Sequence, residues 1–421
     1  MRLLLLIMTC VAVPAGAQTL LLSDIHFDPF ADPAIACRLA SSPVENWTAI
    51  LQSPANTKFP PYGSDTTYPL FVSTLASAKQ RKYDHVIVTG DFLRHNFQQA
   101  FQQAMAGCKG QDYSGFVIKT MRFVNLRIRE AFPTLPVINV LGNNDSTCGD
   151  YEISPDDPHG DASLLAALAK EWRVSGESFR IGGYYSIPSP VVPRQEFVVL
   201  NDIFWSAKYK DACGPQQSDP GGGEMSWLAW TLFRLQSEKK TAVLIMHIPP
   251  GIDAYSSSQV ACPSPAVTFW NPAYGDQFMA LLQKYPGVVT GAFAGHTHMD
   301  DFRVFAGVGM HIIPAVTPDF GNNPAFQVGS ASDFTTVYFA KQLWQPEYTF
   351  SKAYGFPFSE ANLQTLAGQI SSDPKVRGVF SGFYAVSATP SPITAQNWKF
   401  YSCAQTEMGA AGYNRCACSG Q

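Results

Sequence analysis

The sequence is poor in charge and poor in histidine. Charged residues make up 15% of the 421 residues, the formal net charge is -4, and histidine occurs only eight times. A chain without a basic excess has no general electrostatic attraction to nucleic acid. The basic stretches at 79–82 and 127–129 are short and typical of solvated helix faces. We therefore expect no nucleic-acid-binding surface.

Long apolar runs are missing after the first residues. No run beyond position 17 approaches the roughly 20 residues that cross a bilayer, which predicts no transmembrane segment. Residues 1–17 combine Arg2, an apolar stretch at 3–13 and the small residues Ala15-Gly16-Ala17, and match a signal peptide cleaved before Gln18. We expect a secreted protein, extracellular or periplasmic.

The cysteine count agrees with export. Nine cysteines are present, and removal of Cys10 with the signal peptide leaves an even set of eight, which predicts disulfides. The crowding of Cys403, Cys416 and Cys418 predicts a small disulfide-linked C-terminal subdomain. A zinc knuckle is the alternative for these three, although no histidine neighbours them. The sequon that begins at Asn46 makes this residue a glycosylation candidate if the source is eukaryotic.

Five short apolar runs are each followed directly by polar residues. The runs are rich in Val, Ile and Leu and bounded by Gly, Pro or Asp, which predicts buried strands. Ligands of open α/β sheets bind outside the carboxyl ends of the strands, so the polar segments should converge. The runs are 19–22, 85–89, 137–141, 242–245 and 288–294, and the segments after them are Ser23-Asp24-Ile25-His26, Gly90-Asp91, Gly142-Asn143-Asn144-Asp145, Met246-His247 and Gly295-His296-Thr297-His298.

Helical periodicity alternates with these runs, which predicts βαβ units and an α/β fold. Residues 28–67 are rich in Pro, Ser, Ala and Asn and are expected to form a long irregular excursion. We divide the chain into a catalytic domain at 18–345 and a C-terminal subdomain at 346–421. Helices are expected at 68–82, 115–132, 163–172, 224–240 and 276–285, loops at 213–223 and 249–275, and further strands of a second sheet at 304–316 and 334–340.

The polar segments carry the residues of a metal site. A single histidine at a strand end is more often a hydrogen-bonded core residue than a ligand, but four histidines with two aspartates and an asparagine form a joint pattern. Imidazole and carboxylate ligands without thiolate suit Zn, Mn or Fe. Two such ions roughly 3.5–4 Å apart form the clamp that acts on phosphoryl groups.

The order Asp-x-His, Gly-Asp, Gly-Asn-x-Asp, His, Gly-His-x-His resembles the calcineurin-like metallophosphoesterase superfamily over roughly residues 20 to 300. The resemblance implies a two-sheet β-sandwich flanked by helices and a centre of two divalent ions, with Zn as the first choice. It implies a first metal held by Asp24, His26 and His298, a second held by Asn143, His247 and His296, and Asp91 as the bridge between them.

Local sequence resembles the acid sphingomyelinase-like branch, which includes endopolyphosphatases. The segments concerned are Gly90–His95, His247–Gly251, Gly295–Phe302 and the substrate-side loop Pro314–Phe326, whose Phe320–Pro324 stretch makes Asn323 a substrate-binding candidate. Asn144 stands where most of the superfamily has histidine, an arrangement more similar to endopolyphosphatases.

The resemblance implies hydrolysis by a metal-bridging hydroxide that attacks phosphorus in line. Asn144 cannot supply a proton and could only donate a hydrogen bond to a phosphoryl oxygen. His95 is then the candidate general acid, because histidine titrates near neutral pH. Asp28 and Asp145 are candidates for accepting the other N–H of a ligating imidazole, with exposed loop carboxylates as the alternative.

Two kinds of substrate contact are considered. Arg94 would face a polyanion, whereas aromatic walls formed by Tyr255, Trp270 and Tyr274 would suit a choline-type head group through cation–π contact. We expect a secreted dinuclear-metal phosphodiesterase that acts on a small-molecule or lipid-head-group phosphoester, sphingomyelin-like or nucleotide-type. Endopolyphosphatase and phosphomonoesterase activities are the alternatives. A catalytically silent metal- or ligand-binding protein is the alternative of another class, supported only by Asn144.

Overall fold

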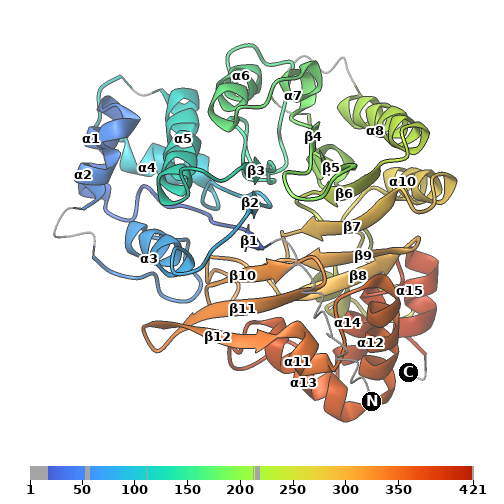
Figure 1. The fold of residues 1–421 in the computed structure, drawn as a ribbon. Coiled ribbons are helices and arrows are strands. Elements are labelled where there is room, and N and C mark those ends of the chain that lie inside the picture. Colours follow the sequence, from blue (N-terminus) through green and yellow to red (C-terminus); the bar gives the residue numbers. More distant parts are fainter. Residues whose placement is uncertain (1–17, 53–56, 111, 212, 214–218, 420–421) are drawn as a thin grey trace, which may run out of the picture.

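The computed structural model describes residues 18–52, 57–110, 112–211, 213 and 219–419. The predicted signal peptide lies outside the described residues. Two six-stranded mixed sheets form the centre of the fold (Figure 1). Helices cover the outer face of each sheet, and the C-terminal helices gather at one end of the sandwich. The predicted two-sheet α/β architecture is confirmed.

The first sheet carries the first three predicted strands side by side. The strands that begin at Thr19, His85 and Val137 run parallel to one another. On the other side of Thr19–Leu22, the strand Ala325–Ser330 pairs with it in the antiparallel direction. The order is β12-β11-β10-β1-β2-β3. The strands are β1 (Thr19–Leu22), β2 (His85–Val88), β3 (Val137–Asn139), β10 (Ala325–Ser330), β11 (Asp333–Ala340) and β12 (Leu343–Thr349).

The second sheet has a parallel centre and two antiparallel edges, in the order β4-β5-β6-β7-β9-β8. Its first two strands were not predicted, because one is half-exposed and contains Ser and Pro, and the other starts with Gln-Glu. The predicted run at 304–316 is a hairpin of two strands. The strands are β4 (Tyr185–Pro188), β5 (Gln195–Val199), β6 (Thr241–Ile245), β7 (Val289–Ala294), β8 (Asp301–Phe305) and β9 (Val308–Ile312).

All five predicted helices are present, and four of them begin two to four residues earlier than predicted. The Pro220 helix starts inside an expected loop, because Asp219 caps it by accepting from the backbone N–H of Gly222 at 2.9 Å and proline suits the first helical position. The other described helices of this part were not predicted. The helices are α3 (Tyr68–Ala78), α4 (Phe97–Ala104), α5 (Tyr113–Ala131), α6 (Asp161–Trp172), α7 (Glu177–Gly182), η3 (Asp202–Trp205), α8 (Pro220–Ser237), α9 (Ala254–Ser258) and α10 (Pro272–Lys284).

The predicted irregular excursion at 28–67 is wrong for its first half, which folds into four short helical segments. Trp47 anchors them: its side chain is fully buried and its Nε1–H donates to the Leu39 carbonyl at 3.0 Å. Asn46 is exposed, and its glycosylation stays a prediction. The segments are η1 (Pro33–Ile35), α1 (Ala36–Ser41), η2 (Val44–Asn46) and α2 (Trp47–Leu51).

The C-terminal helices share a hydrophobic cluster that is separate from the main core and includes Leu363, Phe380 and Tyr413. Phe302 and Val304 of β8 belong to the same cluster, so these helices are packed onto the second sheet. The division of the chain at residue 346 stays a prediction. The helices are α11 (Phe350–Tyr354), α12 (Glu360–Ser372), α13 (Pro374–Tyr384), α14 (Trp398–Ala404) and α15 (Ala410–Ala417).

All eight remaining cysteines form disulfides, as expected. The three cysteines of the C-terminal tail are paired, so they offer no thiolate for a zinc knuckle. The pairs are Cys37–Cys108, Cys148–Cys213, Cys262–Cys418 and Cys403–Cys416.

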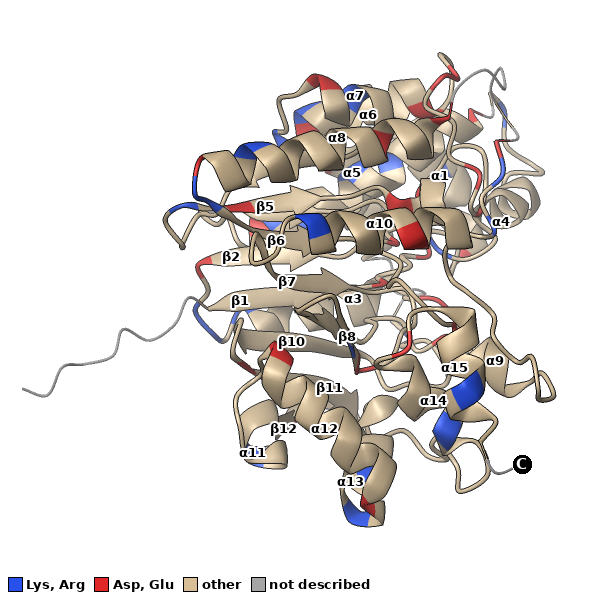
Figure 2. Ribbon diagram, turned by 90° about the vertical axis from the view of Figure 1, so that its right-hand side faces the viewer, with Lys and Arg blue, Asp and Glu red and all other residues tan. Residues whose placement is uncertain are grey.

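Surface charge is dispersed on the face that Figure 2 shows, where Lys and Arg alternate with Asp and Glu over the outer helices and loops. Within the described part of the chain, no helix combines the length and the apolarity needed to span a bilayer.

Candidate dinuclear metal centre

The seven predicted ligands follow five strands of the two sheets and lie together. Asp24 and His26 follow β1, Asp91 follows β2 and Asn143 follows β3. The three remaining histidines follow β6 and β7 of the second sheet. The site is therefore built where the carboxyl ends of the two sheets meet, as expected for an α/β fold.

Three of the ligands form a first group. Nε2 of His298 lies 3.4 Å from Oδ1 of Asp24 and 3.2 Å from Nε2 of His26. The same Asp24 oxygen lies 3.8 Å from Nε2 of His26. All three side chains are buried, so their donor atoms face one another rather than solvent.

The other three form a second group beside the first. Nε2 of His247 lies 2.9 Å from Oδ1 of Asn143. The ligand atoms of Asp91, His247 and His296 lie within 4.8 Å of one another. This group therefore offers imidazole nitrogens, an amide oxygen and a carboxylate.

Asp91 touches both groups. Its Oδ2 lies 3.3 Å from Nε2 of His26 and 3.3 Å from Nε2 of His247. A carboxylate between two sets of donor atoms is what a bridging ligand requires, because it supplies negative charge between two cations.

The imidazole rings are oriented for metal binding. His26 donates its Nδ1–H to the Leu93 carbonyl at 2.9 Å, and His247 donates its Nδ1–H to the Thr89 carbonyl at 2.7 Å. These bonds leave the Nε2 lone pair of each ring directed at the group. The nitrogen and oxygen donors, with no thiolate among them, fit a pair of divalent ions such as Zn, Mn or Fe.

The carboxylate of Asp91 opposes the effect of burial on the pKa of two imidazoles. Burial alone would lower the pKa of His26 and His247, but the Asp91 carboxylate raises these pKa values to about 9 and about 10. Burial and the neighbouring imidazoliums hold the pKa of His296 and His298 well below the usual range. The site is thus a set of strongly coupled charges that a cation can reorganise.

The backbone of the centre is strained and closely packed. Asp24, His26, Asp91, His296 and His298 all have positive φ, between 43° and 69°, which non-glycine residues rarely adopt. Such strain persists only where the surrounding structure enforces it and is typical of functional sites.

Asp145 and Asn144 support Asp91. Asp145 is fully buried and accepts from the backbone N–H groups of Gly142, Phe92 and Leu93 at 2.8–3.1 Å. Asn144 donates its backbone N–H to Oδ1 of Asp91 at 2.9 Å and its side-chain amide to Oδ2 at 3.0 Å. The Asn144 amide is therefore directed at the Asp91 carboxylate.

Asp28 and Arg94 form an ion pair near the centre. Arg94 Nη1 lies 3.5 Å from Asp28, and Arg94 Nε lies 3.2 Å from Asp65. Asp28 also accepts from the backbone N–H of Phe30 at 2.9 Å. Carbonyls, and not Asp28, accept the Nδ1–H groups of His26 and His247, and two carboxylates compensate the charge of Arg94.

His95 lies at the edge of the first group. Its ring stacks on the His26 ring with 3.8 Å between centroids, and its Nδ1 lies 2.7 Å from Oδ1 of Asp65. Asp65 was not predicted, because it lies in the expected irregular segment and no local pattern marks it.

A cavity of about 390 Å³ opens beside the ligands. Tyr255 lines it and is 62% exposed, as expected for a residue of the cavity wall. Trp270 is only 2% exposed and packs against Trp205 and Phe278, because the loop turns its ring into the core. Asn323 is also buried, where its amide donates to the Val386 carbonyl at 2.7 Å. These two residues are not at the cavity.

Several residues of the site were missed. Asp202 follows β5 and accepts from the backbone N–H groups of His247 and Ile248 at 3.2 and 2.9 Å, and burial raises its pKa to about 7. The strand-end rule would have found it if β5 had been predicted. Tyr151 and Lys208 line the cavity from loops that carry no such signal.

Known proteins resemble this chain over most of its length. The model of the calcineurin-like phosphoesterase family matches residues 17–300. The acid sphingomyelinase-like phosphodiesterase 3b of Mus musculus is 25% identical over 413 residues, which cover 87% of this chain and 82% of that protein. The cyclic GMP-AMP phosphodiesterase SMPDL3A of Rattus norvegicus is 24% identical over 376 residues. This match covers 79% of this chain and 81% of that protein.

Among solved structures, a dimetal phosphatase from Danio rerio covers 76% of this chain and 95% of its own, with a TM-score of 0.44 and 12% identity. The family match, the named phosphodiesterase relatives and the clustered His and Asp side chains agree. The chain therefore belongs to the calcineurin-like phosphoesterase family, in its acid sphingomyelinase-like branch, and is a metal-dependent phosphoester hydrolase.

Proposed function

We propose that this protein is a secreted phosphodiesterase with two divalent metal ions, Zn by preference. The observation that carries the proposal is the position of Asp91, whose Oδ2 lies 3.3 Å from an imidazole of each group. The first ion would be held by Asp24, His26 and His298, the second by Asn143, His247 and His296, and both by Asp91. When bound, the ions would activate the attacking water and neutralise the phosphoryl oxygens.

The cavity supports a diester rather than a monoester. It is lined by His95 and Phe320 beside the first group and by Tyr151 and Lys208 beside the second, and it continues to Tyr384 and other residues of the C-terminal part. A phosphorus atom beside the ligands would thus have room for a group on more than one side. A monoester needs space for a single group only.

His95 is the residue that we propose as the general acid. Asp65 holds its Nδ1, so Nε2 is the ring nitrogen left for a leaving group. Asn144 would act through Asp91, because both of its N–H groups are directed at that carboxylate. Its amide cannot replace an acid.

Two kinds of small phosphodiester are the candidate substrates. Relatives are named for sphingomyelin and for cyclic GMP-AMP. Tyr255, Phe269 and Phe320 would pack against either a choline group or a nucleobase. Lys208 favours a substrate with additional negative charge, because it lines the same cavity. Export is proposed from the four disulfides, which persist in oxidising compartments.

The test is turnover of bis(p-nitrophenyl) phosphate and of p-nitrophenyl phosphate by zinc-loaded protein, with and without a chelator. We expect chelator-sensitive hydrolysis that favours the diester. Sphingomyelin, a cyclic dinucleotide and polyphosphate are then compared as natural-type substrates. Absence of turnover with Zn, Mn and Fe would instead favour a silent binding protein.

A further inference from the structure

Asn143 presents its oxygen to the second group because its nitrogen is held elsewhere. Its Nδ2 donates to Oδ1 of Asp150 at 2.6 Å, which leaves Oδ1 directed at His247. The next residue, Tyr151, donates its backbone N–H to the Asn143 carbonyl at 2.9 Å. The Tyr151 hydroxyl also lies 3.2 Å from Nε2 of His296. Asp150 and Tyr151, which we call the arm, therefore orient two of the second group's ligands.

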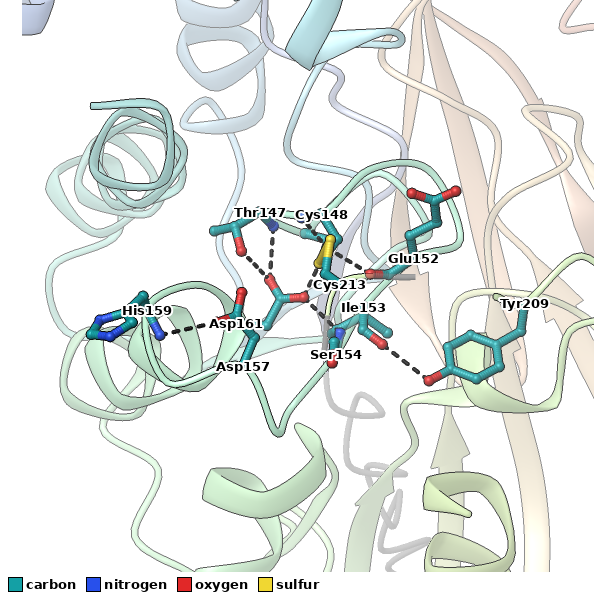
Figure 3. The surroundings of a disulfide bond; sticks show 11 residues. Thr147, Cys148, Glu152, Ile153, Ser154, Asp157, His159, Asp161, Tyr209 and Cys213 are labelled. Carbon is teal, nitrogen blue, oxygen red and sulfur yellow. Dashed lines mark hydrogen bonds between the residues drawn. A yellow bond between two sulfur atoms is a disulfide. The ribbon is translucent and has the colours of Figure 1, made fainter. Parts of the chain in front are cut away.

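The arm is held by Tyr209, Lys210 and Cys213. The backbone N–H of Lys210 donates to the Tyr151 carbonyl at 3.0 Å, and the Tyr209 hydroxyl donates to the Ile153 carbonyl at 3.1 Å. The covalent connection between the two stretches is the Cys148–Cys213 disulfide (Figure 3).

The segment that carries the arm, residues 145–154, is also held by hydrogen bonds that do not involve the disulfide. Asp145 is bound by three backbone N–H groups. Asp161 is fully buried and accepts from Ser146 Oγ at 2.9 Å, from Thr147 N at 2.7 Å and from Ser154 N at 2.7 Å (Figure 3). Reduction of the disulfide would leave these hydrogen bonds in place, but it would remove the covalent link between the arm's segment and Cys213.

The first group does not depend on the arm. The ring of His26 is held by the Leu93 carbonyl, and Asp24 accepts from Oγ of Ser23. The backbone carbonyl of His298 accepts from Ala315 at 3.2 Å. These partners lie outside the loop that the disulfide closes.

We propose that the Cys148–Cys213 disulfide is a redox-responsive tie that sets the affinity of the second metal position and leaves the first unchanged. The inference rests on the proposed ligand assignment. Cys213 is exposed and Cys148 is buried, so a small dithiol would attack Sγ of Cys213. The Cys148 thiolate leaves and takes a proton, and the second thiol of the reductant then frees Cys213. The protein gains two electrons and two protons, and the dithiol becomes a disulfide.

The test compares two cysteine-pair variants. C148S/C213S removes this disulfide, and C37S/C108S removes one that closes a similar stretch, with sequence separations of 65 and 71. Similar loop lengths predict similar losses of stability. Zinc is titrated into each apo-protein, and metal content is measured after dialysis. We expect wild type and C37S/C108S to bind two zinc ions alike, and C148S/C213S to bind the second about tenfold or more weakly.

Unchanged zinc affinities in C148S/C213S would overturn the inference. If that variant does not fold, wild type is treated with a dithiol, alkylated and mapped by mass spectrometry. Retention of the second zinc at full affinity in protein shown to be open at Cys148 and Cys213 would also overturn it. Failure of oxidised wild type to bind two zinc ions would instead contradict the proposed function.

Discussion

Oδ1 of Asp65 lies 2.7 Å from Nδ1 of His95, and the His95 ring stacks on the ring of His26, a proposed metal ligand. The Asp65 carboxylate also accepts from Nε of Arg94 at 3.2 Å, so it is itself held in place. A carboxylate fixed behind an imidazole sets the orientation of the ring and the nitrogen that carries the proton. Asp65 is thus a positioning residue for His95.

Replacement of His95 by Ala should lower turnover of an aryl phosphodiester by more than about tenfold, because a general acid contributes roughly 10²–10⁴-fold. Steady-state kinetics on zinc-loaded protein measures the effect. Zinc content should stay at the wild-type level, since His95 is not among the proposed ligands. A loss smaller than tenfold would contradict the assignment of His95 as the acid.

Asp65→Asn should lower kcat by about tenfold with little change in KM. The amide can still hydrogen-bond, but the negative charge behind the His95 ring is lost. Asp112→Asn is the matched control, because Asp112 caps α5 by accepting from Gly115 and asparagine caps helices equally well. Equal kcat in Asp65→Asn and in the control would show that Asp65 does not position the acid.

The sequence predicts that the candidate ligands lie together, but it does not predict the residues that hold them in place. Asp91 and His247 follow runs of Val, Ile and Leu, so the strand-end pattern fixes their place. Asp65 is placed by tertiary contacts, among them the bond from the backbone N–H of Thr66 to the His26 carbonyl at 3.0 Å. No local sequence pattern encodes such a contact.

The predicted aromatic walls of the cavity also depend on tertiary contacts that the sequence pattern does not encode. Tyr255 and Trp270 both lie in the segment after His247 that was predicted to be a loop, and composition cannot tell which ring faces outwards. Trp270 is anchored by its neighbours, because Ser206 forms a β-bridge with it and its ring packs on Trp205. Which side of a loop is buried depends on the element that it crosses.

Asp91→Asn should empty both metal positions, because Asp91 contacts both groups and an amide carries no negative charge. Metal content after dialysis against zinc, measured by mass spectrometry, should fall from about two ions to well below one. Circular dichroism checks the fold. Retention of one ion at wild-type affinity would mean that Asp91 serves a single position.

Gly142→Ala should disrupt the centre, because a Cβ there would lie 2.1 Å from Oδ1 and 2.2 Å from N of Asp91. The alanine must displace the bridging carboxylate, so zinc affinity and activity should both fall. Gly223→Ala is the control: its Cβ would meet nothing within 4 Å, and it lies in α8, where alanine gains up to about 1 kcal/mol. If Gly142→Ala binds zinc as tightly as wild type, the backbone must accommodate the added Cβ without displacing Asp91, and the prediction is wrong.

Glu347 gives a pH dependence of stability outside the metal centre. Burial raises its pKa to about 9, partly opposed by the hydrogen bond that Ser387 Oγ donates at 2.7 Å. Because its pKa is higher when folded, the folded state holds this proton more tightly. The group's contribution is complete below its unfolded pKa, near 4.5, and is lost as the pH rises towards and through 9.

Glu347→Gln removes this titration and keeps the acceptor for Ser387. Urea unfolding at pH 5 and pH 8 should therefore show a difference in unfolding free energy that shifts in favour of the variant as the pH rises, by at most about 1.4 kcal/mol per pH unit. Ser387→Ala serves as the control, because it loses the hydrogen bond and retains the titrating group. A difference between Glu347→Gln and wild type that does not change with pH would mean that Glu347 titrates normally in the folded protein.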